Sequence, residues 1–179
     1  MLNLDTINQM GRSEFVGYLG RVFENSPWVA NQAWQSRPFA DVSALHAAML
    51  EIVQRQGPLA RQEFLCAHPD LAGREAKQGV MTEESTVEQG TAGLDRLTPA
   101  EVAEIDDLNR RYRSRHGFPF IVCVRHYTKA GIFAEFHHRL GRDSETERTE
   151  ALRQIGNISR YRLDALVESD RETIFAPAA

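Results

Sequence analysis

Arg162 stands where an apolar residue is expected. A stripe at helical spacing is formed by Leu152, Ile155, Ile158, Arg162 and Leu166. Burying a guanidinium without a partner costs several kcal/mol, which favours an anion close to it. We therefore expect either a protein carboxylate or an anionic ligand opposite Arg162.

His68 is the first candidate for proton transfer. Pro69 disfavours helical geometry at the residue before it, so we expect the helix through Phe64 and Leu65 to end at His68. An imidazole titrates near neutral pH and suits general acid–base chemistry. A capping or surface histidine is the alternative reading of the same position.

Three polar side chains share a helical face with a small residue. Ser85, Glu88, Gln89 and Ala92 stand at i, i+3, i+4 and i+7, which favours the wall of a polar pocket. Ser85 and Glu88 also fit a capping box, in which they would only satisfy backbone N–H groups. The capping box leaves Gln89 unexplained.

The elements that would position these residues are mostly helical. We predict helices along the Phe15–Phe23 stripe, after an N-cap at Ser43, from Pro58, from the Thr98 capping box to His116, near Ile132–Leu140, and over about 147–167. Residues 118–124 predict an extended buried segment, and residues 68–85 a functional loop. The predicted fold is an all-α single domain, 1–179, a bundle of about eight helices.

Composition excludes several classes of function. The 179 residues include 42% hydrophobic and 26% charged residues with a net charge of −4, which is typical of a globular domain. The sequence has no basic face that would indicate nucleic-acid binding. It also has no apolar run or leader that would indicate a membrane span or secretion, so we expect a cytoplasmic protein. Cys66 and Cys123 predict buried free thiols, and His137 and His138 diverge too far on a helix for a metal site, so no metal is expected.

Four motifs carry a family resemblance. They are HPDLAG at 68–73, STVEQGTAGLDRL at 85–97, RHGFPFIVCV at 115–124 and ISRYRL at 158–163, preceded by SEFVGYLGRVFENSPWVA at 13–30. Together they resemble the decarboxylases of the uric-acid pathway. Those enzymes convert 2-oxo-4-hydroxy-4-carboxy-5-ureidoimidazoline (OHCU) to (S)-allantoin.

The resemblance implies an all-α, cofactor-free enzyme that is usually a homodimer. It places the catalytic His on His68 and its acidic partner on Glu88. The substrate contacts fall on Pro69, Ser85, Gln89, Phe120 and Ile121. The family's C-terminal Arg matches Arg160 or Arg162, and the helical wheel selects the inward-facing Arg162. The peroxisomal ending of some relatives is absent, because this chain ends Ala-Pro-Ala-Ala.

The implied substrate supplies its own electron sink, since ring carbonyl and nitrogen atoms can delocalise the charge left by CO2. His68 would then transfer protons, and Glu88 would orient it or accept a hydrogen bond from the substrate hydroxyl. Arg162 would face oxygen atoms that gain charge. Two alternatives remain: a helical interaction module in which Arg162 pairs with Glu88 and leaves no pocket, and a hydrolase of the same ureide pathway.

Overall fold

The computed structural model describes residues 1–168, which form an all-α fold. The helices are α1 (Leu4–Gln9), α2 (Arg12–Leu19), α3 (Pro27–Ala33), α4 (Val42–Gln54), α5 (Pro58–Cys66), α6 (Arg74–Gln78), α7 (Glu83–Thr91), α8 (Pro99–His116), α9 (Lys129–Leu140) and α10 (Ser144–Asp164), with 3₁₀ turns η1 (Trp34–Ser36) and η2 (Val124–His126). The only β pairing in the described part is a bridge between Leu2 and Val167. The predicted fold class is confirmed, and the Ala-Pro-Ala-Ala ending lies outside the described residues.

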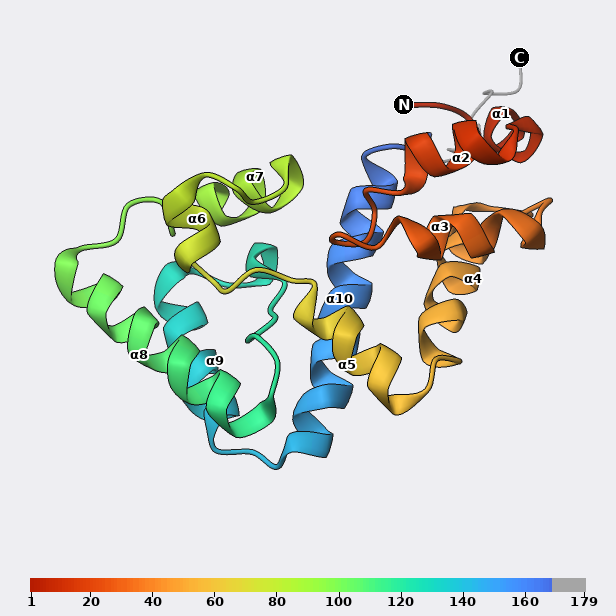
Figure 1. Ribbon diagram of the computed structural model, residues 1–179. Coiled ribbons are helices and arrows are strands. Elements are labelled where there is room, and N and C mark those ends of the chain that lie inside the picture. Colours follow the sequence, from red (N-terminus) through yellow and green to blue (C-terminus); the bar gives the residue numbers. More distant parts are fainter. Residues whose placement is uncertain (169–179) are drawn as a thin grey trace, which may run out of the picture.

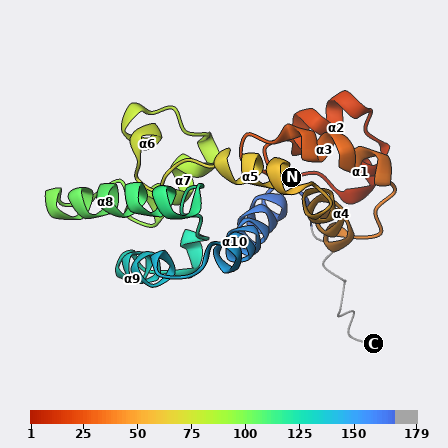
Figure 2. The same cartoon turned by 60° about the horizontal axis from the view of Figure 1, so that its bottom comes forward.

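Helix α10 lies between two groups of helices. Figure 1 shows α1 to α4 on one side of it and α6 to α9 on the other, and Figure 2 shows the same separation after rotation. Helix α10 packs against α4 in the first group and α8 in the second. Its buried face therefore contacts both halves of the core.

Local sequence signals explain where the long helices begin and end. Thr98 caps α8 with a complete capping box, Pro99 opens the helix, and Gly117 ends it with a φ of 80°. Asp143 caps α10, which begins three residues before the predicted start. Asp41 caps α4, so the prediction of Ser43 was wrong, because Asp41 supplies the carboxylate that accepts from the N–H of Ala44.

The segment between α8 and η2 is extended, as predicted, and is held by side chains from α9 and α10. The Phe120 ring stacks on Phe136 of α9 with centroids 3.9 Å apart. Arg139 Nη1 donates to the Ile121 carbonyl at 2.9 Å, and Gln154 Oε1 accepts from the Cys123 N–H at 2.8 Å. These contacts replace the strand partner that the segment lacks.

A buried ion pair lies behind this segment. Arg139 Nε and Glu147 Oε2 are 2.9 Å apart, and both side chains are fully buried. The Tyr112 hydroxyl donates to the same carboxylate oxygen at 2.5 Å. Burial, and then this hydrogen bond, raise the pKa of Tyr112. The network joins α8, α9 and α10 beneath the extended segment.

Two expectations about the intervening segments were wrong. The predicted loop at 68–85 contains the short helix α6, which ends at Gly79 with a left-handed φ of 67°. Cys66 is exposed at the end of α5, whereas Cys123 is buried, and both thiols are free. The Cys66 thiol lies at the C-terminal end of α5 and donates to the Gly117 carbonyl at 3.4 Å, a position that its apolar neighbours in sequence did not indicate.

Candidate active site

A cavity of ≈ 50 Å³ opens to solvent between α7, α10, the turn after α5 and the extended segment. Its wall includes all eight of the predicted catalytic and substrate-binding residues: His68, Pro69, Ser85, Glu88, Gln89, Phe120, Ile121 and Arg162. These positions come from four separate stretches of the chain. The fold therefore brings the predicted site residues together around one cavity.

Arg162 meets two carboxylates at the inner wall. Its Nε and Nη2 atoms donate to the two oxygens of Glu88 at 2.9 and 2.7 Å. Nη1 donates to Glu24 Oε2 at 2.9 Å, and Nη2 also reaches Ser85 Oγ at 3.2 Å. The anion expected opposite Arg162 is thus present as two protein carboxylates, and Arg160 lies outside, paired with Asp164.

Glu24 is the residue that the sequence analysis missed. It lies in the turn between α2 and α3, is 2% exposed, and accepts hydrogen bonds from Thr82 at 2.7 Å and Ser85 at 2.8 Å. Burial would raise its pKa, but Arg162 and the two hydroxyls outweigh burial, so the pKa of Glu24 lies below its ordinary value. The sequence indicated only that Arg162 needs an anionic partner, and this requirement did not distinguish Glu24 from the other acidic residues.

Ser85 is not a helix cap. The N-cap of α7 is Thr82, whose hydroxyl accepts from the Ser85 N–H, so the capping-box reading was wrong. The Ser85 hydroxyl instead donates to Glu24 and accepts from Arg162. Starting the helix one turn earlier places Ser85, Glu88 and Gln89 on the face that lines the cavity.

His68 is held as a neutral imidazole. It is 8% exposed, and its Nδ1 lies 3.3 Å from the Phe64 carbonyl, which can only accept a hydrogen bond. This contact requires the proton on Nδ1 and leaves a lone pair on Nε2. Burial lowers the pKa of His68 to about 4, with Glu24 opposing that shift and Arg162 adding to it. At neutral pH the side chain is therefore a base.

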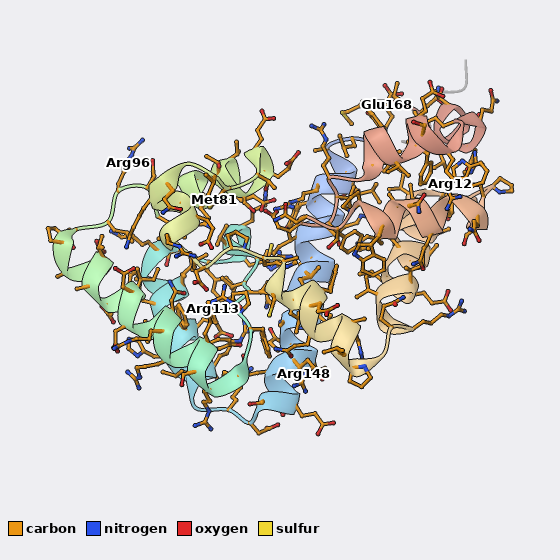
Figure 3. The ribbon with its side chains drawn as sticks, viewed as in Figure 1. Arg12, Met81, Arg96, Arg113, Arg148 and Glu168 are labelled. Carbon is orange, nitrogen blue, oxygen red and sulfur yellow. The ribbon has the colours of Figure 1, made fainter. Side chains whose placement is uncertain are left out.

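Gln89 fixes the turn that carries His68. Its Oε1 accepts from the Ala72 N–H at 2.7 Å, where Ala72 has a φ of 47°, and its Nε2 contacts the sulfur of Met81 at 3.4 Å. Figure 3 shows Met81 beside α7 and Arg113 on α8, and Arg113 pairs with Asp70 at 2.8 Å. The turn after His68 is thus tied to both α7 and α8.

The extended segment presents backbone groups to the cavity. Within residues 1–168, the N–H groups of Ile121 and Val122 have no protein acceptor, while their neighbour Cys123 donates to Gln154. Both residues line the cavity. Free backbone donors beside a polar wall suit a ligand rich in carbonyl oxygens.

The interaction-module alternative predicted an internally paired Arg162 and no pocket. Arg162 is paired, yet it lines the cavity together with His68 and Glu88. The described residues contain no cluster of three or more His, Cys, Asp or Glu side chains that could hold a metal ion. Over the same residues, none of the helices combines the length and apolar character needed to cross a membrane.

Comparison with known proteins identifies similar sequences and folds. A family model described as OHCU decarboxylase matches residues 8–164. The chain is 37% identical over 168 residues to a 2-oxo-4-hydroxy-4-carboxy-5-ureidoimidazoline decarboxylase of Amia calva, covering 93% of this chain and 95% of that protein. A protein of the same description from Halalkalicoccus jeotgali is 38% identical over 165 residues, covering 92% of each chain.

A solved structure described as (S)-allantoin synthase has a similar fold. It superposes with a TM-score of 0.74 at 29% identity, over 94% of this chain and 54% of that chain. The residues around the cavity therefore belong to a fold that has been solved in a second protein.

Proposed function

Because this chain belongs to the OHCU decarboxylase family, we propose that its cavity converts 2-oxo-4-hydroxy-4-carboxy-5-ureidoimidazoline to (S)-allantoin and CO2. The observation that carries the proposal is the neutral His68 facing the same cavity as the Arg162–Glu88 pair. The net reaction exchanges the carboxylate for a proton, so the protein has to place a proton and accommodate a moving negative charge.

His68 is the proposed proton-transfer residue. Nε2 carries the lone pair, so it can take the proton from the hydroxyl on the ring carbon that loses CO2 and return a proton to the ring. The Phe64 carbonyl, rather than Glu88, orients the imidazole. Glu88 is held by Arg162 and keeps the other proposed role, which is to accept a hydrogen bond from the hydroxyl of the bound substrate before that proton passes to His68.

Arg162 and the backbone donors would stabilise the charge that appears in the ring. A guanidinium has five N–H groups, and the contacts to Glu88, Glu24 and Ser85 use four of them. The remaining Nη1–H and the N–H groups of Ile121 and Val122 can face carbonyl oxygens of the ring and ureido group. The ring itself takes the electron pair left by CO2, so the proposed step requires no cofactor.

Pro69, Ser85 and Gln89 are the proposed remaining substrate contacts. Ser85 is committed to Glu24 and Arg162, so its contribution is to fix the polar wall. The Gln89 amide nitrogen retains one hydrogen for a substrate carbonyl, because its other N–H donates to the Met81 sulfur and its oxygen accepts from Ala72. Pro69 shapes the wall beside His68.

The test generates the unstable substrate in solution from urate with urate oxidase and 5-hydroxyisourate hydrolase. Adding the protein should accelerate optical activity and CO2 release together, beyond the spontaneous racemic reaction. Acceleration without CO2 would support the hydrolase alternative, and no acceleration by folded protein would refute the proposal. His68→Gln should abolish the acceleration, while the matched surface variant His138→Gln should retain it.

The proposal extends to the assembly and its location. We propose that residues 1–179 act as one unit, that two copies form a homodimer, and that the enzyme works in the cytoplasm. The homodimer follows from the resemblance of the motifs and their spacing. Light scattering during size-exclusion chromatography would test the dimer, because a mass near 20.3 kDa would indicate a monomer.

A further inference from the structure

The ion-pair cluster at the inner wall of the cavity carries more negative than positive charge. Glu88 and Arg162 line the cavity, and the buried Glu24 lies behind Arg162, so this cluster has two carboxylates and one cation. His68 adds no charge at neutral pH, because burial keeps its imidazole unprotonated. The substrate of the proposed function is itself a carboxylate, which this wall repels. Its binding requires a cation elsewhere on the cavity surface.

Arg125 is positioned to supply that cation. It follows the extended segment at η2, lines the cavity with His68 and Glu88, and also lines the adjoining groove with Tyr161. Its side chain is exposed, which places it at the open side of the cavity. In the part of the chain that the structure describes, no carboxylate pairs with Arg125, whereas Arg21 across the groove pairs with Glu84 at 3.4 Å.

Tyr161 restricts where the Arg125 side chain lies. The guanidinium carbon is 5.3 Å from the centroid of the Tyr161 ring, within the range of a cation–π contact. The Tyr161 hydroxyl in turn lies 3.1 Å from His126 Nε2. The edge of the guanidinium remains free to bind an anion, while its face rests on the ring. This arrangement orders the side chain before a ligand arrives.

We propose that Arg125 is a substrate-anchoring residue that binds the carboxylate of the ring substrate. The inference rests on the proposed function and assigns the charge recognition to the mouth of the cavity. Binding there places the departing CO2 toward solvent and the ring against His68, Glu88 and the backbone donors. A solvent-exposed contact with the carboxylate also stabilises the bound substrate less than a buried one would, and strong stabilisation of the bound substrate would oppose loss of the carboxylate.

The test compares Arg125→Gln with the wild-type enzyme in the coupled assay. Losing one charge-assisted hydrogen bond at a solvent-exposed position should raise the KM for the substrate about tenfold. Turnover at saturation should change much less, and Arg125→Lys should recover part of the loss because it restores the charge. Arg160→Gln is the control, because Arg160 is exposed on the same helix as Tyr161 but pairs with Asp164.

Inhibition by (S)-allantoin separates anchoring from a structural effect, because the product lacks the carboxylate. Arg125→Gln should leave its inhibition constant unchanged. Equal weakening of substrate and product would overturn the proposal, since it would show that Arg125 only shapes the wall. An unchanged KM in an active enzyme would also overturn it while leaving the proposed function intact. A wild-type protein without activity would overturn both.

Discussion

Replacing Glu24 by Gln tests the charge network that the sequence did not reveal. The change keeps the shape of the side chain and removes its charge. The contact to Arg162 spans 2.9 Å between Nη1 and Oε2, and both side chains are nearly buried, at 6% and 1% exposure. Arg162 keeps both contacts to Glu88, so the variant does not leave an uncompensated buried charge.

The expected loss of stability follows from the bonds that disappear. A hydrogen bond to a charged group contributes about 1.5 to 3 kcal/mol. An amide oxygen in place of Oε2 can still accept from Ser85 and Arg162 but carries no charge, and an amide nitrogen in place of Oε1 cannot accept from Thr82. We expect the free energy of unfolding at neutral pH to fall by about 2 to 3 kcal/mol, less than for removing the partner of an isolated buried pair.

The difference in stability between wild type and Glu24→Gln should depend on pH, in a direction set by the pKa of Glu24. The pKa of Glu24 is lower in the folded protein than its value of 4.5 outside it. The stability that Glu24 contributes is therefore fully present above about pH 4.5 and is lost as the pH falls through the folded pKa. The difference between wild type and variant should be constant from neutral pH down to about pH 5 and should shrink below pH 4.5.

Urea unfolding followed by circular dichroism, at neutral pH and at pH 4, measures both quantities. Glu84→Gln is the matched control, because Glu84 makes a longer and more exposed ion pair with Arg21. That variant should change the free energy of unfolding by less than about 0.5 kcal/mol. A loss for Glu24→Gln no larger than that of the control would refute the assignment of Glu24 as a partner of Arg162.

Three further predictions concern other parts of the network. Because the pKa of His68 is about 4, kcat/KM should stay level as the pH falls from 8 and should decline near pH 4; a decline centred near 6.5 would contradict a buried neutral imidazole. Arg162→Lys should reduce kcat/KM by about 100-fold or more in protein that retains its helical circular dichroism, because an ammonium cannot reproduce the two parallel bonds to Glu88. Arg139→Met should lower the free energy of unfolding by about 3 to 5 kcal/mol in urea titrations, because it leaves Glu147 buried without its main partner; a loss below about 1 kcal/mol would contradict this.

The sequence predicted those features that depend on local spacing. The capping box at Thr98, the end of α5 before Pro69 and the inward face of Arg162 each follow from residues within a few turns of one another. The grouping of His68 with Glu88 around one cavity came from the resemblance, since no local rule joins residues on different helices. Ser43, which was predicted to be an N-cap, and Ser85, for which a cap was the alternative interpretation, are not caps, because a residue one turn or less upstream caps each helix.

Glu24 lay beyond local reasoning for a physical reason. It is 138 residues from Arg162 in sequence, and the turn after α2 decides where its carboxylate points. Acidic residues are common on the surface, so their type alone carries no signal of burial. The requirement that Arg162 have an anion was correct, but it specified neither the number of carboxylates nor their positions.

The two carboxylates around Arg162 affect how the substrate lies in the cavity during the proposed reaction. An isolated buried guanidinium would bind the substrate carboxylate strongly and would stabilise the ground state. Here Glu24 and Glu88 already neutralise Arg162, and the excess negative charge at the inner wall directs the carboxylate toward Arg125 at the mouth. As CO2 leaves, the negative charge moves from the carboxylate into the ring. It thereby moves toward the backbone N–H groups of Ile121 and Val122, which favours the transition state over the bound substrate.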